Sequence, residues 1–275
     1  MANLIKLENF AKILPYAEMI WEGLIVTVLL SLFTVIIGFV LALLLAVMRM
    51  CNFRPFLMLA HAFPKTFGFF EVNKQTGLKR DSGFLYHMGR FNPLSLIATS
   101  YVEIIRSTPI LVQIMIIYYG LFGPGMIELP TFTMFGFIKF HRFFPGVVAL
   151  GMNSGAYLCE IIRSGMQSID GGQTEAARSL GLSSTQNLRY IIMPQAIRNI
   201  LPAIANEFVV IIKESAITFT IGVADVFAAI KAIQSANFII MEPLIVVTAI
   251  YFCLCFPTSK LIAYFERRMS RGSKR

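Results

Sequence analysis

Residues 170–202 read DGGQTEAARSLGLSSTQNLRYIIMPQAIRNILP, a polar stretch between long apolar segments. Its first part predicts a short capped helix. Asp170 can cap the N-terminus together with Gln173 three residues later, and Glu175 lies in the first turns, where the helix dipole favours an acid. Gly181 then falls where a left-handed residue would end the helix, a conformation that glycine adopts at no steric cost.

The same start signal recurs directly afterwards. Ser183 with Gln186 repeats the capping pattern, and a second helix runs toward Pro194, which cannot donate an intrahelical hydrogen bond. We therefore expect two short helices hinged at Gly181, both in water beside the apolar part of the chain.

The composition of the whole chain indicates a membrane protein. Apolar residues make up 56% of the 275 residues and charged residues only 14%, and the mean hydropathy is +0.70. Soluble domains average about 45–50% apolar and about 25% charged residues, so this apolar excess needs lipid around it. The net charge of +9 is explained more simply by basic residues that flank membrane spans than by a nucleic-acid partner.

The apolar residues occur in blocks, which favours one membrane domain with short ends. We expect an interfacial segment at 1–20, a membrane domain at 21–266 and a basic cytoplasmic tail at 267–275. Since about 20 apolar residues cross the hydrocarbon core, the blocks predict five spans, at 23–48, 94–122, 143–162, 197–212 and 243–264. A basic loop at 49–92 follows the first span, and residues 215–241 predict short or re-entrant helices.

Basic residues predict the orientation of these spans. They concentrate in the 49–92 loop, around the polar stretch and in the tail. The basic residues assigned to the opposite side are fewer: Lys6, Lys12, Lys139, Arg142 and Lys231. Because basic residues accumulate on the cytoplasmic side of membrane proteins, we expect the N-terminus outside and the C-terminus in the cytoplasm. Within the loop, residues 73–83 predict an exposed turn or hairpin from their Gly, Asn and Asp content.

Charged and helix-breaking residues interrupt the second predicted span. Glu103 and Arg106 are three residues apart, so on a helix they are expected to pair on one face. Pro109 is expected to kink the same helix.

The third predicted span carries the candidate solute pathway. Asn153, Ser154, Tyr157 and Glu160 are polar residues within an apolar helix, and three of them recur at spacings of four and three. Polar side chains in a span face the bundle interior, where they line a solute path or find hydrogen-bond partners. Two interpretations stay open: a pathway-lining stripe, or helix-packing hydrogen bonds with Glu160 paired to Arg163.

Reactive groups do not form a recognisable catalytic or metal site. The cysteines match no zinc or disulfide framework and are expected to be buried thiols: Cys51, Cys159, Cys253 and Cys255. The histidines are not at ligand spacing: His61, His87 and His141. No G-x-x-x-x-G-K-[ST] loop is present, nor any nucleophile with a base and an acid. We expect no catalytic residue and no cofactor in this chain.

Several motifs occur in one order along the chain. They are YVEIIRSTPILVQ at 101–113, LGMNSGAYLCEIIRSGM at 150–166, YFERRM at 264–269, and the spacing EAA---G---------I--P carried by Glu175, Ala176, Ala177, Gly181, Ile191 and Pro194. This set resembles the permease subunits of bacterial ABC importers, in the branch that moves polar amino acids. The resemblance covers most of the chain between residues 21 and 269.

The resemblance implies an all-α integral membrane protein with the type I ABC importer bundle, about five core transmembrane helices and a cytoplasmic coupling helix. It implies a bacterial inner-membrane location, ATP-binding subunits that hold the ATP, a second permease copy or paralogue, and an extracytoplasmic solute-binding protein. Residues 170–194, called the coupling segment below, would seat in a groove of the ATPase. The residues expected to act there are Glu175, Ala176, Ala177, Leu180, Gly181, Leu182 and Pro194.

Within that interpretation each residue type has a physical role. The two alanines let the helix seat closely, the two leucines are apolar anchors, Glu175 meets a basic partner, and Gly181 sets the angle to the next helix. The spacing alone is equally consistent with an ordinary connector stabilised by its own caps.

Two other functions are consistent with polar spans. A secondary transporter or channel would need no ATPase and would use Glu103, Glu160 and Glu207 as intramembrane acids. A non-transporting scaffold would bind a cytoplasmic partner through the coupling segment without solute flux.

Overall fold

The computed structural model describes residues 5–50 and 92–271. The expectations for the turn at 73–83 and for Cys51, His61 and His87 lie outside these described residues. Two helices are long and apolar enough to cross a membrane, and up to four spans result if each of two bent helix pairs counts as one.

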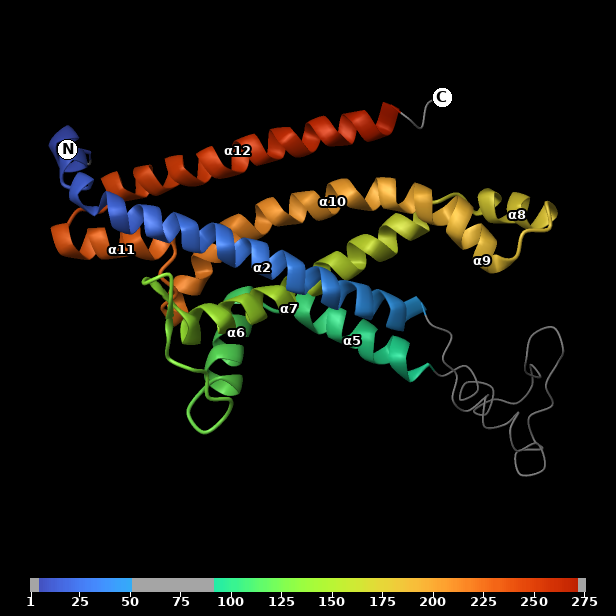
Figure 1. Cartoon of the computed structure of the whole chain (residues 1–275), viewed down its shortest axis with the longest axis horizontal. Helices are drawn as coiled ribbons and strands as arrows, with labels where there is room; N and C mark the ends of the chain where they lie inside the picture. Colours follow the sequence, from blue (N-terminus) through green and yellow to red (C-terminus); the bar gives the residue numbers. More distant parts are fainter. Residues whose placement is uncertain (1–4, 51–91, 272–275) are drawn as a thin grey trace.

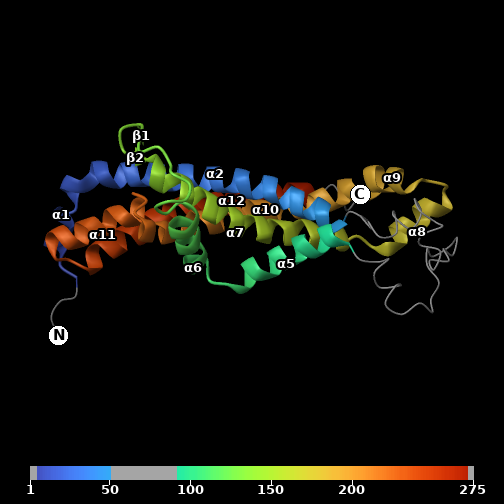
Figure 2. The ribbon, with the colours of Figure 1, turned by 90° about the horizontal axis from the view of Figure 1, so that it is seen from below.

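Residues 5–50 and 92–139 form helices and one small hairpin (Figures 1 and 2). The elements are α1 (Leu7–Ala11), η1 (Leu14–Tyr16), α2 (Ala17–Met50), α5 (Pro93–Ser107), α6 (Ile110–Met115), the π-helical η2 (Ile116–Leu121), β1 (Thr133–Met134) and β2 (Ile138–Lys139). The two strands pair antiparallel, with Thr133 opposite Lys139.

The C-terminal half is helical throughout its named elements. They are α7 (Phe140–Gln167), α8 (Gly171–Ser179), α9 (Ser184–Asn187), the π-helical η3 (Leu188–Ile192), α10 (Met193–Glu214), η4 (Ser215–Ile221), α11 (Val226–Asn237) and α12 (Met241–Arg271). The short helices η4 and α11 confirm the expectation for residues 215–241.

The long helices run side by side along the molecule (Figures 1 and 2). Helix α2 packs most extensively against α7, and α10 packs against α7, α12 and α2. Small residues permit this close approach. A Cβ added at Gly155 of α7 would lie 2.8 Å from the Leu41 side chain of α2, and one at Gly38 would lie 3.1 Å from Ser154.

The second predicted span is broken and not merely kinked, which corrects the expectation for Pro109. The chain bends by 112° between α5 and the helix formed by α6 and η2. Thr108, between them, is extended with φ −119° and ψ 148°, because the residue before a proline avoids the helical region. Pro109 then caps α6.

The second helix of the coupling segment also differs from the expectation. It does not end near Pro194, because α9 continues through η3 into α10 and Pro194 occupies the first turn of α10. Within this continuous helix Pro194 donates no amide to the preceding turn, and the π-helical turn η3 lies directly before it, a local widening of the kind found where the regular bonding ladder is interrupted. The coupling segment is therefore joined by a continuous helical path to a long helix of the bundle.

Helix α12 packs on one side of the bundle, and only a small part of its surface is buried. Cys159 on α7 is buried, as expected, but Cys253 on α12 is exposed and Cys255 is partly exposed. The expectation of buried thiols is wrong for Cys253, because little of α12 is buried among the described residues.

Candidate functional site

Two regions carry the candidate residues, and they lie apart. The coupling segment projects beyond one end of the long helices as α8 and α9 (Figure 1). The polar stripe lies on α7 and consists of Asn153, Ser154, Tyr157 and Glu160.

The caps of the coupling segment hold its two helices in place. The Asp170 carboxylate accepts a hydrogen bond from the Gly172 amide at 2.9 Å. At the second helix, Ser183 and Gln186 form the two-way capping box, with bonds of 2.8 and 3.3 Å. The box expected between Asp170 and Gln173 is not among the contacts of the described residues, so Asp170 alone caps α8.

The turn after α8 confirms the role expected for Gly181, which adopts φ +78°. The Gly181 amide donates to the Arg178 carbonyl at 2.9 Å, and the Leu182 amide donates to the Ala177 carbonyl at 3.0 Å. This bond pair is the Schellman motif, which requires a left-handed residue at this position. The hinge is therefore a defined turn and not a flexible joint.

One face of α8 packs against the chain itself. Ala177 is only 1% exposed, and Asn187 of α9 donates from Nδ2 to the Thr174 hydroxyl at 3.3 Å. Ala177 therefore lies on the face of α8 that is buried within the chain, and its expected role at an ATPase surface stays a prediction.

The other face of α8 is open to a partner. Glu175, Ala176 and Leu180 are exposed, Leu182 is partly buried, and Pro194 lies exposed at the start of α10. Leu180 is 80% exposed, which is unusual for a leucine held on a rigid turn. Ala176 and Leu180 are four residues apart and so lie along one side of the helix, and an exposed apolar surface of this kind suits contact with another protein.

In the polar stripe, Asn153 has a packing role. Its Nδ2 donates to Gln113 Oε1 at 2.9 Å. Gln113 in turn donates to the Ile105 carbonyl at 2.7 Å and to the Thr108 hydroxyl at 2.7 Å. These bonds satisfy backbone and side-chain groups that the break between α5 and α6 leaves open. Gln113 was not among the candidates from the sequence. The only sequence signal for it was Pro109, four residues earlier, because a proline leaves backbone groups that need another hydrogen-bond partner.

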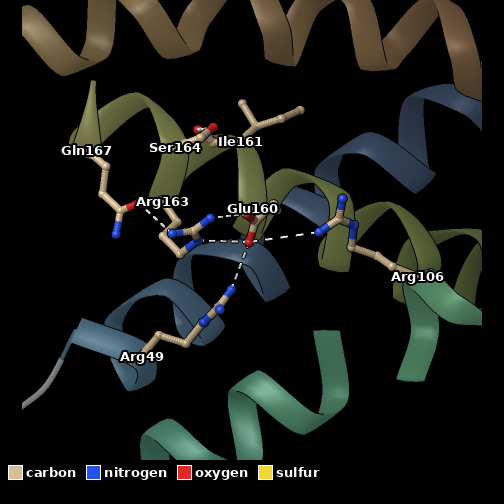
Figure 3. Close-up of polar contacts among 7 residues, drawn as sticks. All are labelled: Arg49, Arg106, Glu160, Ile161, Arg163, Ser164 and Gln167. Carbon is tan, nitrogen blue, oxygen red and sulfur yellow. Dashed lines mark hydrogen bonds and ion pairs between the residues drawn. The ribbon is translucent and has the colours of Figure 1, made fainter. Parts of the chain in front are cut away.

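Glu160 is the centre of a cluster of arginines (Figure 3). Its carboxylate accepts from Arg49 Nη1 of α2 at 3.0 Å and from Arg163 on its own helix, and Arg106 Nη1 of α5 lies 4.0 Å away. The predicted pairing of Glu160 with Arg163 is confirmed. The cluster ties three helices together at one carboxylate.

Arg106 corrects another expectation. It approaches Glu160, and not Glu103 on its own helix, and its guanidinium lies over the Tyr157 ring at 5.5 Å from the centroid. Tyr157 is partly open, whereas Ser154 is buried next to Gly38. The α7 stripe thus contains a packed end at Asn153 and Ser154 and an accessible end at Tyr157.

No candidate metal site accompanies these groups in the described parts of the chain. There, no group of three or more His, Cys, Asp and Glu residues could hold a metal ion. Glu207, considered above as an intramembrane acid, is a partly buried residue of α10.

Comparison with known proteins identifies close relatives. Residues 82–271 match the family model described as the binding-protein-dependent transport system inner membrane component. The chain is 32% identical to the arginine transport system permease protein ArtQ of Bacillus subtilis, over 95% of this chain and 97% of that protein. It is 33% identical to the putative glutamine transport system permease protein GlnP of Rickettsia typhi, over 96% and 98%.

A solved structure shares this fold. It is described as an amino acid ABC transporter with histidines, and it superposes with a TM-score of 0.73 at 39% identity, covering 94% of this chain and 98% of that chain.

Proposed function

Because the chain belongs to the family of binding-protein-dependent transport system inner membrane components, we propose that it forms the translocation pathway for a polar amino acid and couples that pathway to ATP. The chain is a multi-pass permease subunit of an amino-acid ABC importer with the type I fold. It is a transport subunit and not an enzyme, since ATP hydrolysis belongs to a separate subunit in this family.

Family membership also decides between the functions left open by the sequence. It favours an ATP-driven permease over a secondary transporter that would use Glu103, Glu160 and Glu207. The scaffold function has no observation in its favour.

The observation that carries the coupling proposal is the exposed Leu180 on a rigid turn. Ala176 and Leu180, four residues apart, lie along one exposed side of α8 and its C-cap. Glu175 is also exposed, and the buried Ala177 and the Schellman turn at Gly181 fix the orientation of the helix. Because η3 joins this segment to α10 without interruption, a movement of α8 would be transmitted directly to a helix of the bundle. An ATPase subunit that holds α8 can thereby drive alternating access.

The solute pathway follows the α7 stripe in this proposal. Asn153 and Ser154 position the helices through buried contacts, and Tyr157 and Glu160 stand at the accessible end. The partners would be two ABC ATP-binding subunits, a second permease copy or paralogue, and an extracytoplasmic solute-binding protein. The N-terminus lies outside and the tail in the cytoplasm, as the distribution of basic residues favours.

Uptake by a reconstituted complex tests this proposal. The chain, its ATPase and its binding protein are placed in proteoliposomes, and accumulation of a labelled amino-acid panel is measured with and without ATP. We expect ATP-dependent accumulation of at least one polar amino acid. Flux driven by an ion gradient without the ATPase, or no accumulation of any amino acid, would contradict it.

A further inference from the structure

The cluster around Glu160 carries more positive than negative charge. In the described residues, one carboxylate faces the guanidinium groups of Arg49, Arg163 and Arg106. Opposite charges stabilise each other strongly where water is partly excluded, so an excess of cations at such a place favours a further anion.

The three arginines are not equally engaged. Arg49 donates to Glu160 at 3.0 Å, and its side chain is 16% exposed. Arg163 bonds Glu160 through two of its nitrogens. Arg106 lies at 4.0 Å, beyond hydrogen-bond distance, and its side chain is 42% exposed. Among the described residues it makes no hydrogen bond, so its N–H donors are not used there.

Arg106 is nevertheless held in a definite position. The Tyr157 ring supports its guanidinium at 5.5 Å, a contact that orients a planar cation without using its hydrogen-bond donors. Figure 3 shows Arg106 reaching Glu160 from a different side than Arg49. Arg106 also lies at the end of α5, beside the break where Gln113 and Asn153 meet.

We propose that Arg106, supported by Tyr157, binds the carboxylate of the transported solute; this inference rests on the proposed function. A guanidinium fork matches a carboxylate with two parallel hydrogen bonds. Amino acids differ in their side chains but share the α-carboxylate, so one anchor at this place serves any of them. Glu160 acts as a positioning residue, because its bonds to Arg49 and Arg163 leave Arg106 available.

Equilibrium binding separates this role from a structural one. The detergent-solubilised permease–ATPase complex is titrated with each of the twenty standard L-amino acids, and those that bind are compared with their carboxamides, which lack the negative charge. The wild-type complex should bind the amino acid more tightly than its carboxamide. Arg106→Gln should weaken binding of the amino acid by about 10- to 100-fold, the loss typical of hydrogen bonds to a charged group.

The difference between acid and amide is the decisive readout. In Arg106→Gln the two should bind about equally, and Arg106→Lys should keep part of the preference for the acid. Lys260→Gln is the matched control, because Lys260 also lies over an aromatic ring, that of Phe256 at 5.3 Å, but on α12. It should leave both affinities unchanged. Co-purification of the ATPase with each variant confirms that the complex is assembled.

Two results overturn the proposal. One is an Arg106→Gln complex that loses affinity for the acid and the amide by the same factor. The other is a wild-type complex that binds none of the twenty amino acids. The proposed function fails separately: absent ATP-dependent uptake together with an Arg106-dependent preference for the acid would reject the importer function and keep the carboxylate anchor.

Discussion

Replacing Gly181 by alanine should uncouple ATP hydrolysis from transport without preventing membrane insertion. The glycine has φ +78°, and an added Cβ would meet no atom within 4 Å. The cost is therefore confined to the backbone, and holding an L-residue in the left-handed region costs about 1–2 kcal/mol. That energy shifts the population away from the observed hinge by about 5- to 30-fold.

The assay is the number of ATP molecules hydrolysed per solute accumulated in proteoliposomes, and Gly181→Ala should raise this ratio several-fold. Gly171→Ala is the matched control, because Gly171 also has no atom within 4 Å of an added Cβ but is not left-handed. It should behave as wild type. Gly181→Asn should fall between the two, since asparagine tolerates the left-handed region better than alanine.

A normal coupling ratio in Gly181→Ala would refute the reasoning, as would an equal loss in Gly171→Ala. The first outcome would mean that the hinge geometry does not matter for coupling. The second would mean that α8 is sensitive to any change at its surface, whatever the backbone conformation.

The other predictions concern the bundle and are measured as the shift in melting temperature of the detergent-solubilised complex. Glu160→Gln should destabilise the complex by about 2 kcal/mol, because it leaves partly buried arginines unpaired. The control is Glu8→Gln, which should cost under about 0.5 kcal/mol because the pair of Glu8 with Lys6 at 3.9 Å is exposed. Equal shifts in melting temperature for the two variants would contradict this prediction. Asn153→Leu should cost about 1–3 kcal/mol by stripping the donor from Gln113, and an unchanged melting temperature would reject that role. Gly23→Ala should cost about 1–3 kcal/mol, since its Cβ would lie 2.8 Å from the Asp225 carbonyl oxygen, while Gly120→Ala, with no atom within 4 Å, should not destabilise through a clash.

Features with local causes could be predicted from the sequence. The cap at Asp170, the capping box of Ser183 and the left-handed turn at Gly181 each depend on residues within one helical turn. The long helices α2 and α12 follow from uninterrupted apolar composition over the length of a bilayer. The ion pair of Glu160 with Arg163 was also predictable, because a spacing of three residues brings two side chains together on one helix.

Features that depend on how helices face each other could not be predicted in this way. Arg49 and Glu160 are 111 positions apart, and their contact depends on the packing of α2 against α7. Arg106 was expected to pair with Glu103, but the packing of α5 against α7 brings it to Glu160 and Tyr157 instead.

The coupling segment shows the same division within a few residues. Sequence alone determined where its helices begin and where the chain turns, because caps and glycine act through the nearest backbone groups. Only the tertiary structure decided that Ala177 is buried against the following helix while Leu180 is exposed, and that α9 continues through η3 into α10. Burial and helix continuation depend on which surfaces pack together, and that packing is a property of the folded chain and not of any one segment.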